Sequence, residues 1–441
     1  MIIDNWIVAL VATFGGLLVL LILGLPVAFA FLTLDIIWAV LLWGGLGGLE
    51  LLIRNSAEAL TSFTLLPIIL FMLMGEATYR AGIAPNMINA LDNWLGRLPG
   101  RLSLLAVVSG TLLATLTGTT MASCAMLGST LYPEMKSRGY KNSMALGPIV
   151  GSAGLAPLIP PSGLAVLFGV FSNLSIGKLL IGVIVPGIML AILMFTYILV
   201  RCTLQPEIAP IYKQPRMSIV DKLVPTARYI LPITLIIFLV TGVIFLGIAT
   251  PTEAAATGAA GCFILAACYR NLNWKTTKDT LGNTVNTTVM MMAILVGADI
   301  FSSIATYTGA ISGLTAWLVG LPVSPMVIII FLQAAGIFLG FFIGAGAIIM
   351  ITTPVFIPIV IALGFDPYWF GIIYILNMEM AGISPPYGLN LFVMKSVAGP
   401  DVSITEVYKA AYPFVFIQLF EMIILLAFPI IVLWLPNLMK G

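Results

Sequence analysis

The chain has 441 residues, of which 61% are hydrophobic and 8% are charged, and its net charge is +2. Soluble domains carry about 25% charged residues and one bilayer crossing takes roughly 20 apolar residues, so the composition excludes a soluble globular protein. The absence of histidine excludes histidine metal sites and Ser-His-Asp catalysis, and we expect neither an enzyme nor a nucleic-acid-binding protein.

The first half, residues 1–200, is expected to begin with scaffold helices within residues 1–95. Its N-terminal apolar run lacks the basic start and cleavage site of a secretion signal, which predicts a first membrane helix. Residues 45–58 carry three charges and are expected to form a loop, whereas the amphipathic residues 83–95 predict a helix along the membrane interface. Full spans are predicted at 6–23, 27–44, 59–80 and 178–200.

Two further segments of the first half do not resemble simple spans. Residues 101–135 hold two apolar halves on either side of Gly118, each too short for a comfortable crossing. They predict a re-entrant hairpin, with a pair of kinked or tilted helices as the alternative. Residues 143–170 predict a long span that is broken at Ser152-Ala153-Gly154 and again at Pro160-Pro161-Ser162-Gly163.

Residues 201–228 form a long polar stretch with an excess of basic residues, which predicts a cytoplasmic loop connecting the two halves. The second half, residues 229–441, repeats the order of the first. A hairpin is predicted at 325–362 around Gly344, followed by a broken span at 370–394. Its other predicted spans are 229–248, 252–269, 284–306 and 412–434.

One sequence pattern occurs twice, at residues 118–163 and 344–388. Each copy runs from a Gly-rich turn through an apolar segment to a proline, passes a Gly-aromatic pair and ends in Pro-Pro-x-Gly. Matching hydrophobic segments that are interrupted by Gly and Pro in both halves indicate the binding site of a transporter. The alternative, that these residues merely kink ordinary helices, is weakened because the pattern recurs at fixed spacing.

Charge placement orients the two copies. Basic residues flank the first hairpin, whereas no Lys or Arg occurs between 279 and 394. The positive-inside rule therefore opens the first hairpin to the cytoplasm and the second to the opposite side. We predict an all-α polytopic membrane protein built as an inverted-repeat transporter, with about ten spans, two re-entrant hairpins and both termini outside.

The breaks predict where a ligand binds. Proline pairs remove backbone donors and disrupt helix geometry, so freed carbonyl oxygens become available as ligands, and helix N-termini at the breaks favour an anion. The predicted substrate-binding residues are Thr119, Thr120, Ser162, Gly163, Ser384, Gly388 and Asn390. For each single hydroxyl, a bond to its own i−4 carbonyl is the alternative.

Several long motifs resemble one family. They are LGSTLYPEMKSRGY at 127–140, LIPPS at 158–162, TPTEAAA at 250–256, LGFDPYWFG at 363–371 and ISPPYGLNLFV at 383–393. The sequence resembles the large, DctM-like membrane subunit of tripartite ATP-independent periplasmic (TRAP) transporters. The resemblance implies an elevator-type carrier of organic acids in a bacterial inner membrane, driven by Na⁺. It also implies two partners: a small four-helix membrane subunit and a periplasmic substrate-binding protein.

The resemblance also implies two sodium sites, each located between a hairpin tip and a broken span. The implied sodium ligands are Gly118, Ser123, Ser152 and Gly154 in the first half, and Gly344, Ala347, Gly382 and Pro385 in the second. The chain departs from the family pattern at Ser123 and Gly344, where an Asp is common. Sodium at these tips must therefore use carbonyl and hydroxyl oxygens.

Acidic residues within spans are functional candidates by default. Glu76 and Asp299 fall in matching helices of the two halves, and the alternative for Glu76 is local pairing with Arg80, one turn further on. Glu379 lies one turn before Gly382 and is a candidate for holding the break or an ion.

The leading hypothesis is a sodium-coupled organic-acid importer, and the nearest alternative is a free-standing sodium:organic-anion symporter that needs no binding protein. A membrane enzyme, a scaffold and a channel are disfavoured by the missing catalytic groups and by the doubled, inverted break. Because the second half offers no cation between 279 and 394, a small, singly charged acid suits the chain better than a polyanion.

Overall fold

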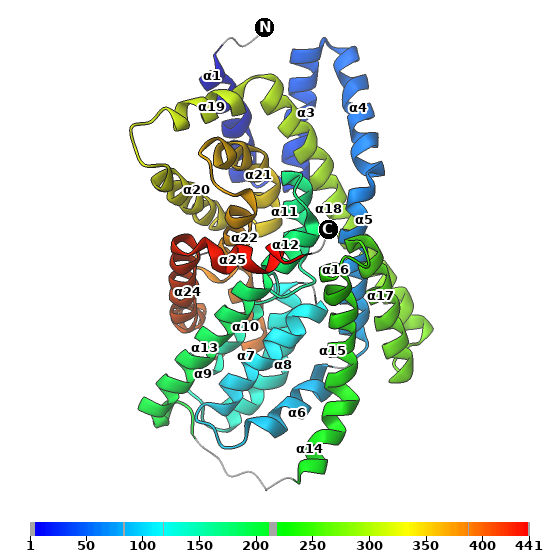
Figure 1. Ribbon diagram of the computed structural model, residues 1–441, viewed down its shortest axis with the longest axis vertical. Coiled ribbons are helices and arrows are strands. Elements are labelled where there is room, and N and C mark those ends of the chain that lie inside the picture. The colour runs from blue at the N-terminus through cyan, green and yellow to red at the C-terminus, as the bar shows by residue number, and fades with distance from the viewer. Residues whose placement is uncertain (1–4, 83, 118, 211–217, 387, 440–441) are drawn as a thin grey trace.

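The computed structural model describes residues 5–82, 84–117, 119–210, 218–386 and 388–439, and every regular element in these ranges is a helix (Figure 1). The predicted all-α polytopic fold is therefore confirmed. Six of the described helices are long and apolar enough to cross a membrane by length and composition. The other apolar helices are shorter, so the count of about ten spans stays a prediction.

The N-terminal helices correct one expectation, because residues 45–58 are not a loop. Gly44 and Gly45, with φ of 84° and 64°, turn the chain back into a helix, and glycine adopts such angles without strain. The three charged residues from Glu50 to Glu58 recur at every fourth position and lie exposed along one helix face. The elements are α1 (Trp6–Leu10), the π-helix η1 (Val11–Gly15), α2 (Gly16–Ile22), α3 (Val27–Trp43) and α4 (Leu46–Thr61).

Gly48→Ala is expected to destabilise the pair formed by α3 and α4. A Cβ at Gly48 would lie 2.0 Å from the carbonyl oxygen of Ala39, so the helices must separate, and such overpacking costs about 1–3 kcal/mol. At Gly47 the same substitution meets no atom within 4 Å and favours the helix by about 1 kcal/mol. Thermal unfolding of the purified variants should give a lower Tm for Gly48→Ala alone. Equal Tm values for the two variants would contradict the close contact.

The next helices include the first hairpin. They are the 3₁₀-helix η2 (Phe63–Leu65), α5 (Leu66–Arg80), α6 (Ala84–Leu95), α7 (Arg101–Thr117) and α8 (Thr120–Ser137). The predicted helix at 83–95 is present as α6, and its Trp94 indole donates a hydrogen bond to Thr226 Oγ1 at 2.8 Å. Helices α7 and α8 pack against each other as the predicted hairpin requires. Their depth in the membrane stays a prediction.

The segment predicted as the broken span of the first half forms helical parts on either side of an irregular segment. Residues 154–162 contain no helix, and all of them except Ile159 are buried. The elements are α9 (Asn142–Ala145), α10 (Gly147–Ala153), α11 (Gly163–Ser172), α12 (Ile176–Gly182) and α13 (Ile184–Leu204). Because this irregular backbone lies inside protein, it satisfies the condition for non-helical structure at membrane depth.

The polar connection between the halves is shorter than the predicted loop at 201–228. Helix α13 continues to Leu204, and a new helix starts at Ile219. Ser218 and Asp221 form a capping box that explains the early start. The elements are the 3₁₀-helix η3 (Pro206–Ile208), α14 (Ile219–Pro225), the π-helix η4 (Thr226–Ile230), α15 (Leu231–Ile237), the π-helix η5 (Phe238–Gly242) and α16 (Val243–Phe245).

The helices before the second hairpin are longer than predicted or were missed. The span expected at 284–306 begins ten residues earlier, at Trp274, because Asn273 caps the helix with a bond from Thr276 N. The sequence interpretation assigned no helix to residues 310–319, yet one forms there. The elements are α17 (Pro251–Cys268), α18 (Trp274–Tyr307) and α19 (Ala310–Val319).

The segment predicted as the second hairpin forms two helices on either side of Gly344, and the segment predicted as the second broken span forms two helices on either side of Pro385. The last span, expected at 412–434, instead begins at Ile404 and is interrupted at Phe428, directly before a proline. The elements are α20 (Pro325–Gly340), α21 (Ala345–Ala362), α22 (Pro367–Ile383), α23 (Leu389–Ala398), α24 (Ile404–Ala427) and α25 (Pro429–Asn437).

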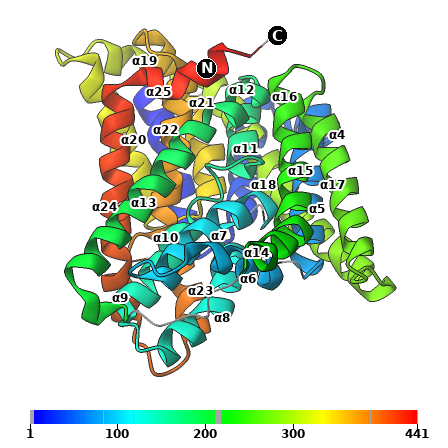
Figure 2. The same ribbon diagram turned by 60° about the horizontal axis from the view of Figure 1, so that its bottom comes forward.

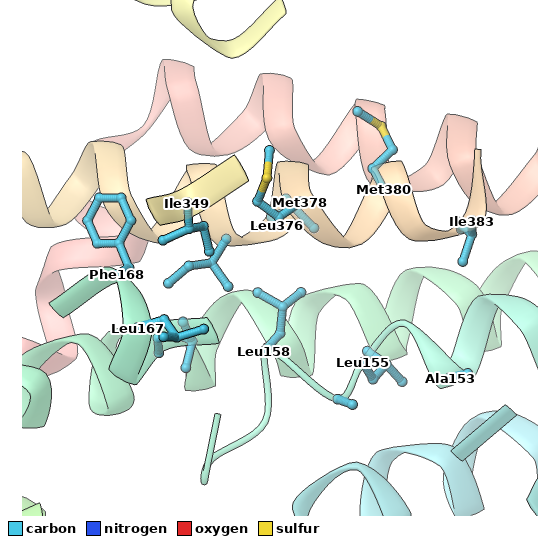
Figure 3. Packing of buried hydrophobic residues seen from close by; sticks show 14 of the residues in the cluster. Ala153, Leu155, Leu158, Leu167, Phe168, Ile349, Leu376, Met378, Met380 and Ile383 are labelled. Atoms are coloured by element: carbon cyan, nitrogen blue, oxygen red, sulfur yellow. The ribbon is translucent and has the colours of Figure 1, made fainter. Parts of the chain in front are cut away.

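The two halves are joined by crossed helix packing. Helix α11, which follows the first break, packs on α21 of the second hairpin, and α23, which follows the second break, packs on α8 of the first hairpin. In Figure 2, α20, α22 and α24 lie on one side of the molecule, and α4, α5, α15 and α17 lie on the other. Figure 3 shows core side chains of the first broken span, including Leu158 and Phe168, facing α22. That the halves are inverted repeats stays a prediction.

Candidate functional site

The tip of the first hairpin meets the second break. Thr120 Oγ1 donates a hydrogen bond to Asn390 Oδ1 at 3.1 Å, and Cys124 Sγ lies 3.5 Å from the Asn390 carbonyl oxygen. Asn390 is fully buried. Two predicted substrate-binding residues that are 270 positions apart are thus in direct contact. The contact joins the two halves, which the duplicated sequence alone did not indicate.

Each hairpin also approaches the broken span of its own half through a glycine. A Cβ at Gly110 of α7 would lie 2.7 Å from the Ser152 Cβ on α10. In the second half, a Cβ at Gly340 of α20 would lie 2.2 Å from the Ala381 Cβ, beside Gly382. Only glycine allows these approaches. The arrangement therefore brings hairpin and broken span together in both halves.

The predicted hydroxyl ligands mostly bond to nearby backbone. Ser384 Oγ donates to the Met380 carbonyl oxygen at 2.6 Å, the i−4 bond named as the alternative. Ser152 Oγ donates to Ile149 O at 3.2 Å, and Ser162 caps α11 by accepting from Ala165 N at 3.1 Å. Thr119 caps α8 in the same way. Each hydroxyl oxygen keeps a lone pair, so these bonds are compatible with coordination of an ion or a substrate.

The remaining predicted ligands surround the breaks and hairpin tips. Ser123 and Ala347 are buried, Gly344 precedes α21, and Gly388 lies directly before α23. Gly118 lies outside the described residues. The peptide bonds Pro160–Pro161 and Pro385–Pro386 are both cis. Among the described residues no group of three or more Cys, Asp or Glu residues is suited to a metal ion, so carbonyls and hydroxyls remain the sodium ligands that the sequence predicts.

A cavity of about 80 Å³ lies between the first hairpin tip and helices α5 and α18. A space of this kind holds several water molecules, since one water needs roughly 10–15 Å³. Thr119 and Gly163, both predicted substrate residues, line it together with Pro161. The other lining residues are Ile68, Phe71, Met72, Glu76, Tyr79, Ala122, Asn283, Thr284 and Thr287. The cavity thus offers hydroxyls, an amide and a helix N-terminus beside apolar walls.

Glu76 is held in an ion-pair network at this cavity. Its Oε1 accepts from Arg80 Nε at 2.8 Å and from Asn283 Nδ2 at 2.8 Å, and Arg80 also pairs with Asp279 at 3.4 Å. The local pairing named as the alternative for Glu76 is therefore confirmed. The sequence interpretation missed the partners on α18. The polar run Asn283-Thr284-Val285-Asn286-Thr287 at the start of an apolar span was the available signal.

Asp35 on α3 was also missed. It is fully buried, and neither carboxylate oxygen has a hydrogen-bond partner among the described residues. A Cβ at Gly297 of α18 would lie 3.6 Å from Asp35 Oδ2. Gly297 precedes the exposed Asp299 by two residues. The single acid in the apolar run 27–44 was visible in the sequence but was given no role.

The sequence matches one protein family over most of its length. A profile described as Tripartite ATP-independent periplasmic transporter, DctM component, matches residues 14–431. The chain is 33% identical over 383 residues to the C4-dicarboxylate TRAP transporter large permease protein DctM of Pseudomonas aeruginosa, covering 86% of this chain and 88% of that protein. It is 28% identical to the ectoine TRAP transporter large permease protein TeaC of Halomonas elongata, covering 97% and 98%. Among solved structures, the YdaH transporter of Alcanivorax borkumensis matches with a TM-score of 0.66 at 15% identity, covering 89% and 90%.

Proposed function

Because the chain belongs to the DctM component family of tripartite ATP-independent periplasmic transporters, we propose that it imports a small organic acid by sodium-coupled alternating access. Membership in this family makes it a multi-pass transporter subunit of the bacterial inner membrane. The observation that carries the proposal is the contact between Thr120 and Asn390. It joins the tip of one hairpin to the break of the other half, next to the cavity at Thr119 and Gly163.

The proposed substrate is a small carboxylate or sulfonate. The relatives named above are a C4-dicarboxylate and an ectoine permease, and both named compounds carry a carboxylate. The N-terminus of α11 begins at Gly163 in the cavity wall and favours an anion. No Lys or Arg is among the described residues that line the cavity, so a second negative charge would find no cation there. This combination supports a singly charged acid over a polyanion.

The movement that we propose is an elevator motion of the hairpins and broken spans against the scaffold helices. The cavity supports this division, because its walls come from the hairpin tip and first break on one side and from α5 and α18 on the other. A substrate held there would be carried past Glu76 and Asn283 as the hairpins move. The scaffold side is stiffened by the Glu76–Arg80–Asp279 network.

The proposed partners are a small four-helix membrane subunit and a periplasmic binding protein that delivers the substrate. The alternative, a free-standing sodium:organic-anion symporter, makes a different prediction for reconstituted protein. Uptake by the complete three-part system should exceed uptake without the binding protein, whereas a free-standing symporter shows no difference. Thermal-shift screening of the binding protein against organic acids would identify the acid to use.

Replacing sodium by choline is expected to abolish uptake. Transport of an acid against its gradient needs an energy source, and the proposed one is the entry of Na⁺ together with the substrate. The measurement is uptake of radiolabelled acid into proteoliposomes that contain the transporter complex and receive loaded binding protein outside. Liposomes made without the transporter provide the background. Uptake that is equal in sodium and in choline would contradict sodium coupling.

A further inference from the structure

Three buried polar side chains without complete hydrogen bonding lie where the first break meets α22, α23 and α24. Glu379 is 2% exposed, and Asn390 and Gln418 are 0% exposed. Within the described residues, Glu379 Oε1, Asn390 Nδ2 and both amide atoms of Gln418 have no hydrogen-bond partner. Most buried polar groups in proteins are paired, so this concentration calls for a physical explanation.

The glycines of both breaks face these groups. A Cβ at Gly154 would lie 2.6 Å from Glu379 Oε1, 3.0 Å from the Gly151 carbonyl oxygen and 3.1 Å from Gln418 Nε2. A Cβ at Gly382 would lie 3.6 Å from Asn390 Nδ2 and 3.9 Å from Glu379 Oε1. The Glu379 carboxylate therefore lies between the two breaks. Figure 3 shows the corresponding backbone, with the α22 segment from Leu376 to Met380 running beside the break at Leu155 and Leu158.

The Glu379 carboxylate has no cationic partner in the part of the chain that the structure describes, because none of the ion pairs found there includes Glu379. Burying an unpaired charge costs several kcal/mol, and an ionisable residue at membrane depth marks an ion or substrate path by default. Glu379 can also supply the negative charge that the hairpin tips do not offer to a cation. The hairpin tips carry Ser123 and Gly344 and contribute no carboxylate to a cation.

The surrounding donors suit a hard monovalent cation. Hard cations prefer oxygen ligands, and here oxygens come from Glu379 and from the Gly151 carbonyl group. The Gly151 oxygen accepts one hydrogen bond, from Gly154 N at 3.1 Å, and keeps a second lone pair. The Gln418 amide adds a third oxygen after a half-turn of its terminal group, because its oxygen and nitrogen are interchangeable in shape. One carboxylate also balances one positive charge.

We propose that Glu379 and Gln418, together with the backbone at the end of α10 and the start of the first break (Gly151–Gly154), bind a sodium ion. The assignment rests on the proposed sodium coupling and adds to it the source of the negative charge, which is α22 rather than a hairpin tip. The Glu379 carboxylate lies near the glycines of both breaks, Gly154 and Gly382. A sodium ion bound to this carboxylate therefore fixes the two breaks relative to each other. A cation here thereby favours the conformation in which Asn390 meets Thr120.

The test is sodium binding to the purified full-length chain without substrate, measured as the rise in Tm when sodium replaces choline. Glu379→Gln keeps the shape and removes the charge, and it should raise the half-saturating sodium concentration by at least about tenfold. Glu421→Gln is the matched control. Glu421 is fully buried on α24 with both oxygens unpartnered, but it is not among the nearest atoms to either glycine, and its variant should keep the wild-type response.

Two further variants separate charge from folding. Glu379→Gln combined with Gln418→Glu returns one carboxylate to the same place and should restore most of the sodium response. Gly154→Ala inserts a Cβ 2.6 Å from Glu379 Oε1 and should weaken sodium binding without altering charge, which keeps the inference testable if Glu379→Gln does not fold. Wild-type sodium binding in Glu379→Gln or in Gly154→Ala overturns the inference and leaves the proposed transport function standing. A wild-type chain that shows no response to sodium contradicts the sodium coupling itself.

Discussion

Replacing Pro385 and Pro386 by alanine is expected to lower uptake by about tenfold or more while the amount of folded protein stays nearly unchanged. Each proline disfavours helix by about 3 kcal/mol, and only about 1.4 kcal/mol is needed for a tenfold change in an equilibrium. Without the prolines, α22 can extend toward α23, and carbonyl oxygens of the second break, including the one at position 386, become bonded within a helix. The bond from Tyr408 Oη to the Pro386 carbonyl oxygen, 2.9 Å long, is then lost as well.

The measurement is initial uptake into proteoliposomes, normalised to protein that remains monodisperse after purification. A matched control exists in the same half of the chain. Pro354 and Pro358 lie inside α21, which continues through both of them, so replacing this pair by alanine removes the same two rings without closing a break. Full transport by the Pro385→Ala, Pro386→Ala variant would show that the second break is only a kink.

Asn390→Leu is expected to weaken substrate or sodium affinity by about tenfold to a hundredfold. The substitution removes the acceptor of the Thr120 hydroxyl and leaves that donor without its partner. Breaking a bond in a partly buried place such as this one costs roughly 1–3 kcal/mol, which corresponds to the stated change in affinity. Because the bond joins the first hairpin to the second break, its loss also loosens the conformation that holds the ligand.

The concentration dependence of uptake on acid and on sodium measures this effect. Asn377→Leu provides the control, because Asn377 is equally buried and, among the described residues, its amide donates to Gln333 at 2.7 Å rather than to the first hairpin tip. Both variants lose a buried amide, so a general loss of stability should affect them alike. Equal affinities in the two variants would contradict a specific role for the Thr120–Asn390 contact.

The sequence predicted the features that depend on local chemistry. Adjacent prolines disrupt helix geometry, so the positions of the two breaks followed from Pro160, Pro385 and the glycines beside them. The loop expected at 45–58 was wrong because charges were taken as a sign of irregular structure, although their spacing from Glu50 to Glu58 fits one helix face. The capping residues Ser218 and Asn273 were overlooked for a similar reason, and two helices therefore begin earlier than predicted.

The rest of the site depended on contacts between distant parts of the chain. No local pattern connects Thr120 to Asn390 or Glu76 to Asn283, since these pairs are 270 and 207 residues apart. The sequence instead paired each hairpin with the broken span of its own half. Those approaches exist at Gly110 and Gly340, but the crossed packing between halves could not be read from a repeat that treats each half separately.

The crossed packing of α11 on α21 and of α23 on α8 also sets an order in time for biosynthesis. Helix α8 leaves the ribosome long before α23. The face of α8 that packs on α23 therefore stays uncovered in the membrane until nearly the whole chain has been inserted. Contacts between such distant segments form late. Neither half, produced alone, has the helix that completes its core, and truncation before residue 389 should leave a membrane-inserted but unfinished protein exposed to quality-control proteolysis.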